Sequence, residues 1–394
     1  MGVLIMANGS RYRNCALFLL TIALFSYMLV FIITWHSARS HPQIYSLETR
    51  LASLELQEIN HTIIDTETLH STASFEVKPW NFTGSNDLNY PLEVDMPELV
   101  RRVLNNLSVD VEPINKPDFP ILVSNSDRCE KISPDLLLLI KSAPANFAKR
   151  DTIRLTWGSE YCWGGRRVVH LFLLGNDPTL DTHSAARLAE ELRIQKDLIQ
   201  QDFIDQYHNN TYKVLFGIEW AVRYCPQVPL IMFVDDDFFV YPRNVIAFVE
   251  GLSVGVKERL FAGYAWNNAA PVRTKWPGRK KKWMVTVDEF PNRVYPPYVA
   301  GGNFFLSMKI AKELRIASWY TRYLRFDDVY LGILLKKLIR TPLHIPQIYA
   351  FDAINESSEQ LHSMLSSHDY ASPTAQLALW HRLDCSSFCT KPIT

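Results

Sequence analysis

Strand-length apolar runs alternate with helix-like segments in the C-terminal part of this chain. The apolar runs cover residues 136–140, 168–174 and 230–234, and the helix-like segments cover residues 185–201 and 212–224. This alternation predicts an α/β fold with a mostly parallel central sheet flanked by helices. Ligands of such sheets bind beyond the carboxyl ends of the strands, so the residues after each apolar run are the first candidates for a functional site.

The composition is that of a globular protein without a dominant charge. The chain has 394 residues, 47% of them hydrophobic, with 41 basic and 41 acidic side chains. This length allows an anchor and one or two domains of about 150 residues each. Because the charges balance, no overall field attracts a polyanion, and we expect no nucleic-acid partner.

An uncharged stretch near the N-terminus has the length of a transmembrane helix. Residues 15–35 form 21 consecutive uncharged positions, which as a helix span about 31 Å at ~1.5 Å per residue. The alternative, a secretory signal peptide, has a shorter apolar region of about 7–15 residues. We therefore predict a cytoplasmic tail (1–14), a transmembrane signal anchor (15–35), a stem (36–130) and a functional C-terminal domain (131–394).

The region beyond the anchor has the features of a lumenal protein. It contains five Asn-x-Ser/Thr sequons, at Asn60, Asn81, Asn106, Asn209 and Asn355. Its five cysteines would allow two disulfides with one thiol left over in an oxidising compartment, but their spacing does not set the pairing. A short amphipathic stretch, residues 47–59, is either a frayed helix in the stem or a contact with a partner stem. A homo-oligomer formed through the anchor or the stem therefore stays an alternative.

Three carboxylates follow the third apolar run directly. Asp235, Asp236 and Asp237 come immediately after residues 230–234 and before another apolar triplet. Adjacent like charges at the end of a buried strand need a cation or full solvation. A hard divalent ion with oxygen ligands is the natural cation, and it leaves coordination positions for substrate phosphates. The alternative is an acidic turn exposed to solvent.

A second acidic pair begins a helix-like segment. Asp327 and Asp328 precede the apolar residues 329–335. One interpretation is helix capping, because acids in the first turn favourably meet the positive end of the helix dipole. The other is that one of them is a general base held opposite the metal site.

Two further segments have residues suited to a phosphorylated sugar ligand. Gly301 and Gly302 interrupt the extended segment 295–307, which marks a bulge or a close approach of the backbone to a ligand. Arg150 and Arg154 have the i, i+4 spacing of one helix face and could reach a diphosphate; surface ion pairs are the alternative. The basic residues 279–282, between Trp276 and Trp283, are interpreted as a solvated loop that could also hold an acceptor.

Four of these segments together resemble one family. They are RDTIRLTWG (150–158), FVDDD (233–237), residues 295–307 and FDDVYLG (326–332). In this order they are similar to the brainiac-like β1,3-glycosyltransferases, which include β1,3-galactosyl- and β1,3-N-acetylglucosaminyltransferases. The resemblance covers residues 136–380. It implies a GT-A-type nucleotide-sugar-binding fold, residence in the Golgi membrane as a single-pass type II protein, a UDP-sugar donor, a glycan acceptor on lipid or protein, Mn²⁺, and inversion at the anomeric carbon.

The resemblance also assigns roles to individual residues. Asp235 and Asp237 match the DxD pair that engages the nucleotide sugar and the metal, with Asp236 between them at the donor. Asp328 matches the catalytic base, and His368 resembles the histidine that completes the metal site. In this reading Arg150, Arg154, Gly301 and Gly302 contact the donor.

The donor sugar is the least determined feature. Residues 326–332 look more like the N-acetylglucosaminyl branch, whereas Gly301-Gly302-Asn303 departs from both branches. On the strength of residues 326–332, UDP-N-acetylglucosamine is slightly favoured over UDP-galactose. The Asn303 amide can donate and accept, so it is a candidate contact for an N-acetyl group. The alternatives from other classes are a lumenal metal-dependent carbohydrate-binding protein without transferase activity, and a glycosidase with paired acids.

Overall fold

The computed structural model describes residues 78–79, 94–115, 119–130, 132–273 and 281–390. The chain divides into two units, Met1–Thr72 and Ala73–Thr394, and all described residues belong to the second. Among them, no helix is long and apolar enough to cross a membrane. The predicted anchor, residues 15–35, lies outside the described residues.

Nine strands of the described chain form one sheet, and six of them run in the same direction. This confirms the predicted α/β fold with a mostly parallel sheet. In spatial order the strands are β1 (Lys78–Pro79), β10 (Leu343–His344), β8 (Phe261–Trp266), β9 (Tyr298–Ser307), β6 (Leu230–Asp235), β3 (Leu136–Lys141), β4 (Val168–Asn176), β5 (Leu198–Ile204) and β2 (Ile121–Val123).

Strand β3 shows why the apolar runs form the centre of the sheet. All six of its residues are buried, as expected for a parallel strand covered on both faces. Leu137 and Leu139 pack into one apolar cluster, whereas Leu136, Leu138 and Ile140 pack into a second one. The side chains of a strand point alternately to opposite faces, so the continuous apolar run serves both layers.

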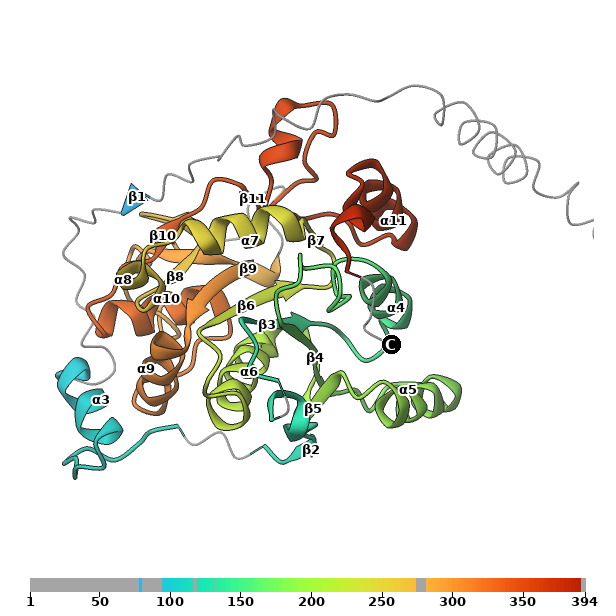
Figure 1. The fold of residues 1–394 in the computed structure, drawn as a ribbon. Helices are drawn as coiled ribbons and strands as arrows, with labels where there is room; N and C mark the ends of the chain where they lie inside the picture. Colours follow the sequence, from blue (N-terminus) through green and yellow to red (C-terminus); the bar gives the residue numbers. More distant parts are fainter. Residues whose placement is uncertain (1–77, 80–93, 116–118, 131, 274–280, 391–394) are drawn as a thin grey trace, which may run out of the picture. The chain divides into compact units, whose positions relative to one another are not determined.

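Helices cover both faces of the sheet (Figure 1). The first cluster includes residues of α3 (Met96–Leu104), α6 (Asn210–Tyr224), α9 (Met308–Trp319) and α10 (Asp327–Lys337). The second includes residues of α4 (Phe147–Leu155), α5 (Thr182–Ile194), α7 (Pro242–Gly251) and α11 (Pro373–Arg382). A short helix, α8 (Val254–Lys257), precedes β8.

A second, three-stranded sheet joins the C-terminal part of the chain to the segment after β6. Its strands are β11 (Ile348–Tyr349), β12 (Ser366–Ser367) and β7 (Phe239–Val240). Ser367 of β12 is opposite Phe239 of β7. Because His368 follows β12 and the aspartate triplet precedes β7, this pairing brings two distant segments together.

Two sequence predictions need correction. Residues 185–201 are not one helix, because α5 ends at Ile194 and β5 begins at Leu198. The stem does not extend to residue 130 either. Strand β2 pairs with β5, and α3 packs on α9, so residues 94–115 and 119–130 belong to the folded unit. Met96, Leu99, Val100 and Cys129 are buried with its core, which a proline-rich composition did not reveal.

The cysteines pair across the folded unit. Cys129 is bonded to Cys225 and Cys162 to Cys389, while Cys385 is a buried free thiol. Two disulfides with one thiol left over agree with the sequence expectation. The first bond fixes the segment before β3 to the end of α6, which places that segment in the folded unit as well.

Candidate active site

The strand order places a ligand site between β3 and β6. Strands β3, β4 and β5 follow one another outward in one direction, and the chain then returns to add β6 on the other side of β3. A nucleotide ligand of an open α/β sheet binds at such a reversal, beyond the carboxyl ends of the strands. The two strands end in register there, with Lys141 opposite Asp235.

Lys141 connects the two acidic segments, although the sequence analysis did not identify it. Its buried Nζ lies 2.9 Å from Oδ1 of Asp235 and 3.1 Å from Oδ2 of Asp327, and it donates to the carbonyl of Gly301 at 3.0 Å. Burial alone would lower the pKa of Lys141, but the two carboxylates raise it above its ordinary value. The available signal was a charged residue that closes an otherwise apolar run.

Asp236 turns into the protein rather than toward the edge of the sheet. Its Oδ2 accepts from Ser142 at 2.7 Å and from Asn146 at 2.8 Å, and its Oδ1 lies 2.8 Å from Nζ of Lys149. The residue is 5% exposed. The predicted donor contact of Asp236 is therefore corrected: both of its oxygens fix the loop to the start of α4.

Asp237 and His368 face each other across the second sheet. Oδ2 of Asp237 lies 3.5 Å from Nε2 of His368, whose Nδ1 donates to the carbonyl of Phe351 at 2.9 Å. The hydrogen bond with Asp237 raises the pKa of His368. Burial would raise the pKa of Asp237, but His368 and nearby lysines hold it below its ordinary value. Oδ1 of Asp237 is buried and has no hydrogen-bond partner among the described residues.

The paired glycines lie between the two acidic segments. A Cβ at Gly301 would lie 3.2 Å from Oδ2 of Asp327, and a Cβ at Gly302 would collide with the ring of Phe238. The backbone at both glycines is thus closely approached by protein side chains, and the predicted contact of the glycines with a ligand stays a prediction.

Asn303 does not reach this edge. It is fully buried, its Nδ2 donates to the carbonyl of Phe233 at 3.2 Å, and its Oδ1 has no hydrogen-bond partner within the described chain. A side chain enclosed in the sheet cannot contact a sugar in the cleft. The predicted contact between Asn303 and an N-acetyl group is corrected on this ground.

Asp328 has the environment of a general base. It is the second residue of α10, and its Oδ1 accepts from the amide of Val329 at 2.7 Å. Burial and the neighbouring charge of Asp327 raise the pKa of Asp328 to about 7. A base is most effective when its pKa lies near the working pH. The N-cap of this helix is Phe326, and Asp327 and Asp328 lie in its first turn, as the helix-dipole alternative also predicted.

Arg150 and Arg154 lie on one face of α4, as predicted, but they do not face the edge of the sheet. Arg150 is fully buried, and two of its nitrogens bond Glu191 at 2.8 and 2.6 Å. Its other N–H groups donate to Ser142, Ala143 and Pro144. Arg154 pairs with Asp151, Glu191 and Asp197. The predicted diphosphate contact is therefore corrected, because both guanidinium groups are engaged inside the protein.

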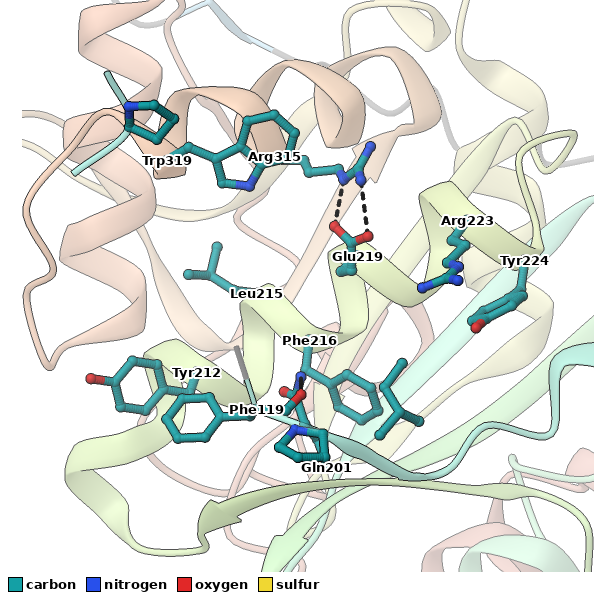
Figure 2. Close-up of a pocket in the computed structure, with 13 residues that line it drawn as sticks. Phe119, Gln201, Tyr212, Leu215, Phe216, Glu219, Arg223, Tyr224, Arg315 and Trp319 are labelled. Atoms are coloured by element: carbon teal, nitrogen blue, oxygen red, sulfur yellow. Dashed lines mark hydrogen bonds and ion pairs between the residues drawn. The ribbon is translucent and has the colours of Figure 1, made fainter. Parts of the chain in front are cut away.

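A large cavity in the described chain lies away from the ends of β3 and β6. It is an open cavity of about 750 Å³ lined by α6, α9 and the segment before β2 (Figure 2). The ion pair between Glu219 and Arg315, with Nη2 at 2.9 Å from Oε1, lies on its wall. None of the predicted site residues lines this cavity.

The arrangement at the ends of β3 and β6 has the elements of group transfer from an anionic donor. Asp237 and His368 lie on one side of it, Lys141 at the centre, and Asp328 on the other side. Within the part of the chain that the structure describes, no group of three or more His, Cys, Asp and Glu side chains is already close enough to hold a metal ion.

Comparisons with known proteins identify the relatives of this chain. The profile of the Galactosyltransferase family matches residues 148–344. Beta-1,3-galactosyltransferase 2 of Mus musculus is 31% identical over 333 residues, covering 80% of this chain and 77% of that protein. Beta-1,3-galactosyltransferase 1 of Mus musculus is 35% identical over 233 residues, covering 59% of this chain and 69% of that protein.

Among solved structures, a galactosyltransferase in complex with donor and acceptor sugar analogues is 12% identical, with a TM-score of 0.33 over 65% of this chain and 98% of that chain. The family itself follows from the sequence matches, which extend over most of the chain and of the relatives. The chain therefore belongs to the Galactosyltransferase family, is related to the β1,3-galactosyltransferases, and is a glycosyltransferase.

Proposed function

We propose that the chain is an inverting, metal-dependent β1,3-hexosyltransferase that moves a sugar from UDP to a glycan acceptor, with Asp328 as the base. The observation that carries this proposal is the position of Asp328 in the first turn of α10, beside Asp327, whose Oδ2 lies 3.1 Å from Nζ of Lys141 at the end of β3. A GT-A-type donor site is supported by the reversal of strand order at that point.

The proposed reaction is a single displacement. The acceptor hydroxyl oxygen attacks the anomeric carbon from the face opposite UDP, and the bond between that carbon and the UDP oxygen breaks. The electron pair of this bond goes to the leaving diphosphate, and the hydroxyl proton goes to the carboxylate of Asp328. An α-linked donor therefore gives a β-linked product. Lys141, within reach of both acidic segments, holds Asp235 and Asp327 in place.

Asp237 and His368 are suited to bind a divalent ion such as Mn²⁺, with Asp235 as a further ligand. His368 donates its Nδ1 proton to a backbone carbonyl, which in the neutral ring leaves the lone pair of Nε2 directed at Asp237. The buried Oδ1 of Asp237, without a partner among the described residues, is an acceptor that an ion would satisfy. When bound, a divalent ion stabilises the negative charge that develops on the leaving diphosphate.

We propose UDP-galactose as the donor. The sequence preference for N-acetylglucosamine rested on residues 326–332, and Asn303, the candidate contact for the N-acetyl group, is fully buried. The relatives with 31% and 35% identity are named β1,3-galactosyltransferases. N-acetylglucosamine transfer remains the competing prediction.

We also propose that the protein is a type II membrane protein of the Golgi, anchored by residues 15–35. Its support is the apolar length of that segment. The exposure of Asn106 and Asn355, which begin two of the sequons, is consistent with lumenal glycosylation.

The test is to incubate the full-length chain with UDP-galactose or UDP-N-acetylglucosamine and with β-linked galactose, mannose and N-acetylglucosamine acceptors, with Mn²⁺ or a chelator. We expect acceptor-dependent UDP release with UDP-galactose, lost in chelator and in Asp237→Ala. Transfer of N-acetylglucosamine alone would overturn the donor. Sugar binding without UDP release would favour the carbohydrate-binding alternative and overturn the proposed reaction.

A further inference from the structure

Two exposed aromatic side chains lie next to each other on the side of the site where Asp328 is. Tyr207 is 43% exposed and Trp283 is 42% exposed. The indole Nε1 of Trp283 donates to the hydroxyl of Tyr207 at 2.9 Å. Nζ of Lys282 lies 4.2 Å from the centre of the Tyr207 ring and 5.5 Å from that of Trp283. The three side chains form one surface.

Contacts connect this surface to the start of α10. His208, next to Tyr207, bonds the carbonyl of Lys282 at 3.0 Å. The ring of His208 packs edge-on against Phe326, with ring centres 6.3 Å apart, and Phe326 is the N-cap of α10. The electrostatics agree with this proximity: burial and the charges of Asp328 and Asp327 raise the pKa of the Tyr207 phenol, although the hydrogen bond with Trp283 lowers it.

The loop that carries Trp283 is fixed to the same helix start. Arg325 donates to the carbonyl of Met284, and its Nε lies 3.2 Å from Oε1 of Glu289. Arg273 holds the following residues through hydrogen bonds to the carbonyls of Thr286, at 2.6 Å, and Phe290, also at 2.6 Å. Arg325 is three residues before Asp328. Its contacts therefore connect the loop that carries Trp283 to the segment that carries the proposed base.

The position of a base determines where the acceptor must lie. A general base has to be within hydrogen-bond reach of the hydroxyl whose proton it takes. The sugar ring that bears this hydroxyl therefore lies against the residues around Asp328. Aromatic side chains with an apolar face and a polar edge are suited to this contact, because the C–H groups of a pyranose pack on the ring while its hydroxyls meet the polar edge.

We propose that Tyr207 and Trp283 form the binding platform for the terminal sugar of the acceptor. The proposal rests on the proposed function and makes it more specific. The acceptor is a hexopyranoside that stacks a C–H face on these rings, and the stacking directs its hydroxyl toward Asp328. Neither ring contacts the donor, because the donor binds at the ends of β3 and β6, on the other side of the acceptor.

The test compares Trp283→Ala and Trp283→Phe with the parent in the full-length chain, using the acceptor that gives most UDP release. We expect Trp283→Ala to raise the KM for the acceptor about tenfold, with the KM for the donor unchanged and kcat little changed. Loss of binding shared by substrate and transition state has this signature. Trp283→Phe retains a ring and is expected to recover part of the affinity.

The matched control is Tyr161→Ala. Tyr161 is 53% exposed and precedes the amino end of β4, at the opposite edge of the sheet. The Tyr161→Ala substitution should leave the KM for the acceptor and the KM for the donor unchanged. Circular dichroism checks the fold of each variant, and Tyr207→Ala gives the same test if Trp283→Ala does not fold.

An acceptor KM of Trp283→Ala equal to that of the parent, or an equal rise in the donor KM, would overturn the platform while leaving the transferase intact. Failure of the proposed function has a different signature, because the parent itself would then release no UDP with any acceptor. A rise in the acceptor KM that Trp283→Phe partly reverses supports the platform.

Discussion

Two clusters of buried charge lie close together in this fold, and they differ in how they are neutralised. The ionic network lies between α4, α5 and the strands β4 and β5, and consists of Arg150, Arg154, His170, Glu160, Glu191 and Asp197. The acidic edge lies at the carboxyl ends of β3 and β6 and at the start of α10, and consists of Lys141, Lys149, Asp235, Asp236, Asp237, Asp327 and Asp328.

In the ionic network, each acid has a cationic partner. Two arginines and one histidine face three carboxylates, and the pKa of His170 is raised: burial lowers it, but Asp197 and Glu160 outweigh that effect. In the acidic edge, two lysines and His368, which faces Asp237, accompany five carboxylates. An excess of buried negative charge is costly unless a cation or a substrate compensates it. The first cluster thus stabilises the fold, and the second is suited to bind a ligand.

The largest expected effect is the loss of the base in the acidic edge. We expect Asp328→Asn to lower kcat by about 10²- to 10⁴-fold, because the amide cannot take the acceptor proton. The free energy of unfolding should not fall, since burial and the charge of Asp327 raise the pKa of Asp328 and so disfavour its charged form in the fold. Rate measurements and urea unfolding check this. A variant with the parent's kcat would remove Asp328 from the chemistry. Asp135→Asn, on a surface pair with Arg167, is the matched control.

For the ionic network we expect the opposite result, which is a loss of stability without a change in the kinetics of the folded protein. Arg150→Met should lower the free energy of unfolding by about 3–5 kcal/mol, because it leaves the buried Glu191 with less compensation. The donor KM of the remaining folded protein should not change. Urea unfolding and donor kinetics at low temperature measure the two effects. Arg193→Met, whose partner Glu190 is exposed, should leave the free energy of unfolding nearly unchanged. A higher donor KM with normal stability would restore the diphosphate role of Arg150.

Addition of Mn²⁺ probes the excess negative charge directly, without turnover. A ligand that binds the folded state at about 100 times its Kd stabilises it by about 2.7 kcal/mol. We expect Mn²⁺ to raise the Tm of the parent protein and to raise that of Asp237→Asn less. Differential scanning calorimetry with and without the ion gives the comparison. An equal shift in both proteins would place the ion elsewhere.

The smallest expected effect is the pH dependence of the ionic network. Because the pKa of folded His170 is raised, its contribution to stability is fully present below about 6.5 and is lost as the pH rises through the folded pKa. On the acidic side, hydrogen bonds with His170 and Arg154 outweigh burial and lower the pKa of Asp197 to about 2. Its contribution is therefore lost as the pH falls from about 3.8 toward 2.

The measurement is the free energy of unfolding of the parent and of His170→Gln as a function of pH. The variant should lack the decline above pH 6.5, which the parent should show. Parallel profiles for the two proteins in that range would mean that His170 is not charged in the fold.

The sequence by itself determined the main strands and helices, and the edge of the sheet at which the acidic segments meet. The apolar runs became β3, β4 and β6, the segment with paired glycines became β9, and Asp327 and Asp328 begin a helix. These features depend on local periodicity, on burial of whole strands and on the fixed direction of parallel strands. Such properties depend on residues that are adjacent in the sequence, so they can be predicted from it.

Only the tertiary structure decided which charged side chains form ion pairs inside the protein. Arg150 pairs with Glu191, 41 positions away, and Lys141 reaches Asp327, 186 positions away. Spacing along the chain identified two arginines on one helix face but could not show that Glu191 of α5 and Asp197, just before β5, cover that face. It likewise could not show that Asn303 is enclosed, or that β12 brings His368 to Asp237. The free energy of a charge depends on its burial and on its partners, and both are set by segments that are distant in sequence and adjacent only in the fold.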